Sequence, residues 1–182
     1  MAERLTSLDA IEAAVWRELA AAVGDKEHAW RTPVLATVDG DAADARTVVL
    51  READAAQRQL LVYTDTRAPK VAQATSHPVG TLLMWSPALG WQLRCRVQLA
   101  VEDSGLAISS RWAALQHTRA AQDYLSPLAP GVRLDAAAPT AAQRTHFGVI
   151  TASVLAIDWL ELHRDGHRRA LLEPQRARWI QP

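Results

Sequence analysis

The sequence predicts a mainly β fold of the α+β class, an antiparallel barrel with helices at its periphery. Several short stretches rich in β-branched residues are separated by turn signals, and only a few segments have apolar residues at helical spacing. Strands do not alternate with long helices as they do in a parallel sheet, and no internal repeat is visible. The length of 182 residues fits one domain over residues 1–182.

Helices are expected mainly at the edges of this sheet. An N-terminal helix within residues 1–24 has Leu8, Ile11, Val15 and Leu19 on one face, with Ser7 as its cap and Gly24 at its end. A short helix over 67–75 would begin at Thr66, and 105–124 should be helical in two pieces. Residues 126–145, rich in Pro and Ala, are expected to form a long loop.

The strands are assigned from period-two patterns and turn residues. The expected ranges are 33–38, 45–52, 59–64, 79–85, 91–101, 147–162 and 167–172. In 91–101 the pattern alternates most clearly. Trp91, Leu93, Cys95, Val97, Leu99 and Val101 take one face, which should pack inside, and Gln92, Arg94, Arg96 and Gln98 take the other.

The last two strands offer two registers. A two-residue Asp165–Gly166 turn would place Trp159 and Arg169 on opposite faces of the hairpin. A three-residue loop with Gly166 in the left-handed conformation would pair His163 with His167 and place Trp159 and Arg169 on one face. The second register separates polar from apolar residues better, so we expect it.

Composition excludes several classes of function. The formal net charge is zero, so nothing suggests a nucleic-acid or anionic-membrane partner. The single cysteine, Cys95, excludes an intrachain disulfide and fits a reducing, cytoplasmic setting. No apolar signal core or membrane-spanning run is present. His163 and His167 lack a third ligand at metal spacing, so no metal site is expected.

One stretch, from Ala45 to Lys70, gathers cations and hydroxyls on two expected strands and a basic turn. Its charged side chains are Arg46, Arg51, Arg67 and Lys70, with Tyr63 and Thr64 between them. Such groups suit a phosphate-bearing ligand on a sheet. An ordinary hairpin with solvated arginines is the alternative, and core packing is the alternative for Trp159.

The residues closely resemble the pyridoxamine 5′-phosphate oxidase family, in particular its related FMN-binding proteins. The matching motifs are Arg46-Thr-Val-Val-Leu-Arg51, Tyr63-Thr64, Arg67-Ala-Pro-Lys70, Trp85, Gln92, Trp159 to Arg169 and the closing Trp179-Ile-Gln-Pro182. The resemblance spans roughly residues 30–182. It implies a split-barrel homodimer with FMN at the subunit interface and a small-molecule substrate.

The resemblance also implies site residues. Arg46 and Lys70 look like ligands of the FMN phosphate, and Gln92 looks like a hydrogen-bond partner of the flavin ring. Trp159 and Arg169 look like contacts from the partner chain. The residues along the flavin would be Thr47, Val48, Val49, Leu50, Arg51, Tyr63 and Thr64. Arg51, Arg119 and His167 would face the substrate. Strand parity sets Arg46 and Arg51 on opposite faces, so either a bulge realigns them or Arg51 faces a substrate, and we expect the second.

Departures from the family pattern concern the substrate. The family's four phosphate-gripping positions correspond to Arg51, Trp112, Arg119 and Asp123, and an aspartate would repel a phosphate. The family's Arg-x-His pair is Asp165-Gly166-His167 in this chain. The expected function is therefore an FMN-dependent oxidoreductase without an assigned substrate. The alternatives are a flavin carrier without catalysis, or a split barrel that binds haem or a deazaflavin.

Overall fold

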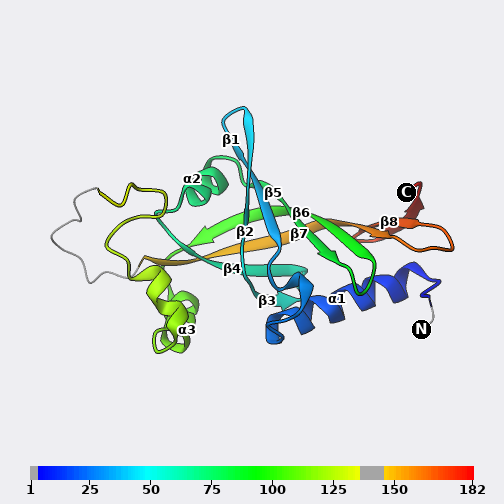
Figure 1. Cartoon of the computed structure of the whole chain (residues 1–182), viewed down its shortest axis with the longest axis horizontal. Coiled ribbons are helices and arrows are strands. Elements are labelled where there is room, and N and C mark those ends of the chain that lie inside the picture. The colour runs from blue at the N-terminus through cyan, green and yellow to red at the C-terminus, as the bar shows by residue number, and fades with distance from the viewer. Residues whose placement is uncertain (1–3, 136–145) are drawn as a thin grey trace.

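The computed structural model describes residues 4–135 and 146–182, and in these its strands form one nine-stranded antiparallel sheet (Figure 1). The strands are β1 (Val34–Asp39), β2 (Ala42–Thr47), β3 (Leu50–Asp54), β4 (Gln59–Asp65), β5 (Val79–Ser86), β6 (Trp91–Glu102), β7 (Phe147–Glu161), β8 (Arg168–Glu173) and β9 (Arg176–Ile180). The helices are α1 (Leu8–Gly24), α2 (Pro69–Ser76) and α3 (Leu106–Leu115), with 3₁₀ turns η1 (Ala29–Arg31) and η2 (Arg119–Tyr124).

The sheet runs in the order β2-β1-β5-β6-β7-β4-β3, with β8 and β9 added beside β7. The long strand β7 makes this possible, because residues 147–153 pair with β4 and residues 157–161 pair with β8, while β6 lies along its other edge. In the described residues β2 and β3 end the path unpaired with one another, so the sheet stays open. The expected antiparallel fold with peripheral helices is confirmed.

Helices cover the sheet from two sides, with α1 and α3 on one side and α2 beside the β1–β2 hairpin on the other (Figure 1). Ser7 caps α1 as expected, since its Oγ accepts a hydrogen bond from the Ala10 amide at 3.2 Å. The apolar face of α1 is buried in the main core. None of the described helices has the length and apolar character that a bilayer span requires.

Two local assignments prove wrong. The expected strand 45–52 is two strands, because β2 pairs with β1 up to Thr47 and β3 pairs with β4 from Leu50. A β-branched run does not reveal such a change of partner. The second helix begins at Pro69 rather than after Thr66, since a turn in which the Ala68 amide donates to the Asp65 carbonyl precedes it. Proline suits this first position because its missing N–H is not needed there.

The register of the final hairpin also corrects the sequence prediction. Its last pair is Glu161 with Arg168, and Trp159 lies opposite Ala170. Trp159 and Arg169 are therefore on opposite faces, as in the register that we rejected. Gly166 does adopt a positive φ of 104°, but the connection is longer than three residues. The β9 strand that follows was not predicted at all.

Buried tryptophans explain this register. Trp159 is fully buried, with its ring centroid 5.4 Å from that of Trp91, which lies 6.4 Å from that of Trp30. This cluster fills the core beneath α1. A large apolar surface is stabilised more by this packing than by a place on a polar face, so Trp159 turns inward with Ala170. The alternation expected for 91–101 is confirmed, with Trp91 to Leu99 buried at every second position.

Candidate functional site

Arg46 of β2 has its guanidinium fixed by neighbours on three elements. Its Nη1 donates to the Leu35 carbonyl at 3.2 Å and to the Thr37 hydroxyl at 2.5 Å. Its Nη2 donates to Oε1 of Gln73 at 2.8 Å and forms an ion pair with Asp44. The guanidinium is thus held where the β1–β2 hairpin meets α2.

Lys70 lies in the first turn of α2, one turn before Gln73. The spacing of three residues places both side chains on the same face of the helix. Burial lowers the pKa of the half-buried Lys70, and the nearby charge of Arg46 lowers it further, while Asp65 opposes the shift. Within residues 4–135 and 146–182, no ion pair neutralises this ammonium group. Two neighbouring cations of which one lacks a counterion are suited to bind an anion.

Arg67, the third cation of the basic turn, has a different role. It binds both carboxylate oxygens of Asp65, at 3.0 and 2.7 Å. It also donates to the carbonyls of Ser126 (2.9 Å), Pro127 (3.2 Å) and Leu128 (3.4 Å). Arg67 therefore anchors the start of the expected loop 126–145 and is not available to a phosphate. Residues 136–145 of that loop lie outside the described residues.

The segment between Arg46 and Arg51 alternates between accessible and buried residues. Val48 and Leu50 are buried in the core, Val49 is partly buried, and Thr47 is exposed. A ligand beside this segment can reach peptide groups and the side chains of Thr47 and Val49. The buried side chains of Val48 and Leu50 pack in the core instead.

The hydroxyl groups of Tyr63 and Thr64 on β4 both form hydrogen bonds within the chain. The Tyr63 hydroxyl donates to Oε1 of Glu52 at 3.2 Å, and the buried Thr64 hydroxyl donates to the Asp65 carbonyl at 3.0 Å. Arg111 of α3 binds the same Glu52 at 2.6 and 2.7 Å, and these hydrogen bonds lower the pKa of that carboxylate despite its partial burial. Sequence reasoning missed Arg111, because its helix carries no motif that links it to β3.

Arg51 sits where the pairing of β3 with β4 slips by one residue, between Leu50 and Glu52. Its guanidinium carbon lies 5.5 Å from the centre of the Tyr63 ring. The Nε atom is buried and has no hydrogen-bond partner among the described residues. A buried donor without a partner is costly unless a ligand satisfies it. The break between β2 and β3 removes the premise of the parity argument, since Arg46 and Arg51 lie on different strands.

Gln92 and Arg169 are brought together on the outer face of the sheet. Gln92 pairs with Trp85 on one side and with Leu160 on the other, and Leu160 pairs with Arg169, so the four form one row across four strands. Trp85 is 42% exposed, and Asp158 holds Arg169 at 2.8 and 2.7 Å. This row offers an amide, an aromatic face and a cation. Trp85 is among the matching motifs, and its parity on β5 places it on this exposed face.

This row is distant from the Arg46–Lys70 pair along the same chain. Arg46 aligns through Leu35 and Leu82 with Cys95 of β6. Gln92 therefore lies three residues, about 10 Å, further along β6, and three strands, about 14 Å, across the sheet from β2. The structure thus divides the expected site residues into two separate groups.

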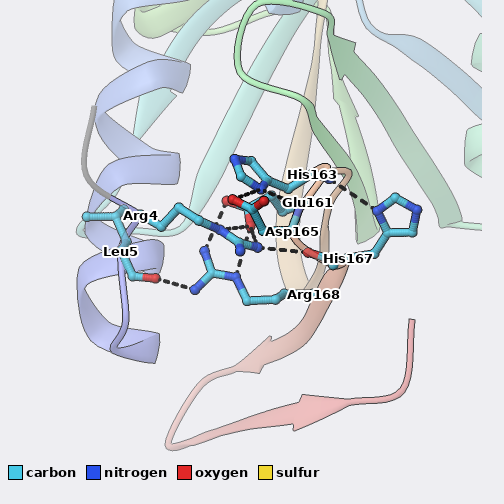
Figure 2. A network of polar contacts seen from close by, with 8 residues as sticks. Arg4, Leu5, Glu161, His163, Asp165, His167 and Arg168 are labelled. Atoms are coloured by element: carbon cyan, nitrogen blue, oxygen red, sulfur yellow. Dashed lines mark hydrogen bonds and ion pairs between the residues drawn. The ribbon is translucent and has the colours of Figure 1, made fainter. Parts of the chain in front are cut away.

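Three further expected residues lie apart from both groups or lack a free surface. Trp159 is fully buried, so it presents no face to a ligand in this arrangement. Arg119 is exposed at the start of η2. His167 is exposed in the final hairpin, where its Nδ1 accepts from the His163 amide at 3.1 Å (Figure 2). Their roles towards FMN or a substrate stay predictions.

The same hairpin holds the N-terminal segment through an ion network (Figure 2). Glu161 is buried between Arg168, at 2.9 and 3.0 Å, and Arg4, at 2.9 Å. Arg168 also donates to the Leu5 carbonyl at 2.7 Å. This network holds residues 4 and 5 against β7 and β8. In the part of the chain that the structure describes, no three His, Cys, Asp or Glu side chains gather as a metal site would require.

Comparison with known proteins decides the family. Residues 13–103, half of the chain, match the family described as pyridoxamine 5′-phosphate oxidase, FMN-binding domain. The chain belongs to this family. The resemblance drawn from its motifs is thereby confirmed. No protein among those with curated descriptions matches the chain.

Solved structures share the fold of this pyridoxamine 5′-phosphate oxidase-like chain. A pyridoxamine 5′-phosphate oxidase-related, FMN-binding protein from Nostoc punctiforme superposes with a TM-score of 0.74 at 22% identity, covering 97% of this chain and 100% of its own. PhzG from Burkholderia lata, solved with tetrahydrophenazine-1-carboxylic acid, gives 0.73 at 17% identity, with 93% and 91% covered. These similarities confirm the split-barrel fold.

A more distant member of the fold group binds a different ligand. A haem-binding protein from Mycobacterium smegmatis gives a TM-score of 0.58 at 14% identity, covering 94% of this chain and 60% of its own. The fold alone therefore does not name the cofactor. The residues of this chain fit a phosphate-bearing cofactor, because the half-buried Lys70 lies outside any ion pair among the described residues and the charge of Arg46 acts on it.

Proposed function

We propose that this protein is an FMN-binding oxidoreductase that exchanges hydride between a small molecule and the flavin. The observation that carries the proposal is the pair of Arg46 and Lys70, of which Lys70 is half-buried and lacks a counterion in the described chain. A phosphate monoester would supply the missing negative charge. When bound, FMN supplies hydride exchange at its N5 atom, which requires no acid or base from the protein.

The remaining site residues have roles that follow from their positions. The peptide groups of residues 47–50 and the segment of Tyr63 and Thr64 would lie along the flavin, where they exclude water from one side. Gln92 would hydrogen-bond the ring, and Arg169 would stabilise negative charge on the reduced flavin. The fully buried Trp159 is left out of this contact set.

We further propose that two chains build each site, as a homodimer with FMN at the interface. The Arg46–Lys70 group and the Gln92–Arg169 row are separated along one chain, so a second copy would bring the second group to the first. The outer face that carries the row is apolar enough for an interface. Exposed side chains on it include Val79 (52%), Leu83 (37%), Trp85 (42%) and Leu155 (47%).

Hollows on the same face support this arrangement. One of about 380 Å³ is lined by Arg94, Arg96 and Asp158, and one of about 550 Å³ is lined by Val79 and Leu155 among others. Asp158 forms ion pairs with both Arg94 and Arg169, so one carboxylate is shared between two cations. Protein interfaces combine apolar patches with a polar rim, and this face carries both exposed apolar side chains and ion-paired arginines.

The substrate is proposed to be something other than pyridoxamine phosphate. Two of the positions that correspond to the family's phosphate grip are unsuitable, because Trp112 packs against Phe147 at 5.5 Å between ring centroids and Asp123 is an exposed anion. Arg51 remains as a cation towards a small substrate, with its Nε free of protein partners among the described residues. Arg119 and His167 stay candidate substrate contacts.

The test separates catalysis from mere binding. The purified protein, reconstituted with FMN, is mixed without oxygen with a panel of small reductants and amines, and bleaching of the flavin absorption is followed by stopped flow. Oxidoreductase activity predicts bleaching with at least one compound at a rate above that of free FMN, and loss of this rate in Arg51→Ala. A bound flavin that no compound reduces faster than free FMN would instead support a carrier.

A further inference from the structure

The ion pair between Asp44 and Arg46 competes with the proposed ligand. Asp44 lies on β2, two residues before Arg46, opposite Thr37 in the pairing of β1 with β2. Its Oδ2 forms an ion pair with Nη2 of Arg46 and accepts from Nε2 of Gln73 at 2.9 Å. The carboxylate thus bridges one cation and one amide donor.

Asp44 differs from the other partners of Arg46 in charge and exposure. Thr37, the Leu35 carbonyl and Gln73 are neutral, and Thr37 and Gln73 are buried. The Asp44 side chain is 45% exposed. The three neutral contacts would hold the guanidinium in place if Asp44 turned to solvent, so the carboxylate is not needed to position it. An exposed ion pair is also weak.

A phosphate cannot share Arg46 with Asp44 at low cost. A phosphate monoester carries up to two negative charges, and like charges at one guanidinium repel. If Asp44 leaves, the N–H of Arg46 Nη2 that does not bind Gln73 and an N–H of Gln73 Nε2 both become free donors beside Lys70. Three donors from β2 and α2 would then face one anion.

We propose that Asp44 is an internal competitor of the phosphate: its carboxylate binds Arg46 and Gln73 in the free protein, and a phosphate-bearing ligand displaces it. Gln73 then becomes a further phosphate ligand. This inference rests on the proposed binding of FMN. It concerns Asp44 and Arg46 of β2 and Gln73 of α2, and it predicts that removal of the Asp44 charge strengthens ligand binding.

The test compares Asp44→Asn with Asp41→Asn. The asparagine at 44 removes the charge but keeps an oxygen that can accept from Gln73. Asp41 is an exposed residue of the same hairpin, so its replacement removes an equal charge without touching Arg46. Dissociation constants for FMN and for riboflavin, which lacks the phosphate, are measured by flavin fluorescence.

Asp44→Asn is expected to bind FMN about threefold to tenfold more tightly than the wild type, since a weak competing ion pair is removed. Asp41→Asn should bind FMN as the wild type does, and riboflavin should bind all three proteins equally. Asp44→Ser should shift FMN binding in the same direction as Asp44→Asn. Equal or weaker FMN binding by both position-44 variants would overturn the proposal.

Pyrophosphate distinguishes failure of this inference from failure of the proposed function. It probes the anion site without a flavin, through the rise in melting temperature that it causes. A larger rise in Asp44→Asn than in the wild type, with no FMN binding by either, would overturn the FMN assignment and support the competition. An equal or smaller rise would overturn the competition even if FMN binds.

Discussion

The buried side chain of Gln73 joins helix α2 to Arg46 of β2 through a hydrogen bond of 2.8 Å. The same Oε1 atom accepts from the Thr37 hydroxyl at 2.6 Å. Because Gln73 is 5% exposed, these bonds are shielded from water and fix the orientation of the guanidinium. The helix that presents Lys70 therefore also positions Arg46, which makes the two cations one unit.

Replacement of Gln73 should remove the contact that holds Arg46 to α2. In Gln73→Leu the buried Thr37 hydroxyl and Arg46 lose an acceptor, which should lower the free energy of unfolding by about 1–3 kcal/mol. FMN should also bind more weakly, because Arg46 is no longer held. Urea unfolding and flavin fluorescence measure the two effects. Gln57→Leu, an exposed matched control, should change neither, and unaltered FMN affinity in Gln73→Leu would refute the positioning role.

The charge of Lys70 should make FMN binding sensitive to alkaline pH. Its pKa lies below the ordinary value of 10.5 because of burial and the nearby Arg46. The protonated lysine attracts the phosphate, so affinity should fall as pH rises through this lowered pKa. Lys70→Arg stays charged and should not show this fall, while any ionisation of FMN itself affects both proteins alike. Parallel pH profiles for the two proteins would contradict a phosphate contact by Lys70.

Trp159 should contribute to stability rather than to flavin binding. Trp159→Ala removes a fully buried ring from the tryptophan cluster and should cost about 3–5 kcal/mol of unfolding free energy. The FMN affinity of the folded fraction should stay close to that of the wild type. Trp85→Ala is the comparison, since Trp85 is exposed beside Gln92 and its loss should weaken FMN binding with little effect on monomer stability. Weaker FMN binding by Trp159→Ala with unchanged stability, and unchanged FMN binding by Trp85→Ala, would instead make Trp159 a ligand contact.

The ion pairs of Glu161 with Arg4 and Arg168 should make the free energy of unfolding depend on pH in the acidic range. Burial raises the pKa of Glu161, but hydrogen bonds and charges from Arg168 and Arg4 outweigh it, so the pKa lies below the ordinary 4.5. The stabilisation is therefore fully present above pH 4.5 and is lost as pH falls through the lower folded-state pKa. Glu161→Gln should be less stable by about 1–3 kcal/mol at neutral pH, with the difference shrinking in acid. A constant difference from pH 7 to 3 would contradict this.

Sequence patterns predicted the fold where a single periodicity governs a segment. The face pattern of 91–101 and the cap at Ser7 are of this kind. The patterns failed where tertiary contacts decide. The run from Ala45 to Glu52 changes partner at Val48 and Val49, and only the position of β4 sets that break.

The final hairpin shows why polarity alone misassigned a register. Trp159 was expected to share a face with Arg169, but its face of β7 is buried, and Glu161 can lie on that face because two arginines neutralise it. Arg4 comes from the far end of the chain, so no local pattern includes it. Local patterns therefore supplied the motif residues Arg46, Lys70 and Gln92, whose roles towards a cofactor stay predictions, and they placed Trp159 on the wrong face of its strand.

The most direct test of the central claim is native mass spectrometry of the purified protein with a saturating amount of FMN. The account predicts a mass of two chains with two FMN molecules, and loss of the bound FMN when Arg46 and Lys70 are both replaced by alanine. A monomer that carries FMN would contradict the two-chain site. A protein that stays free of FMN at saturation would contradict the account as a whole.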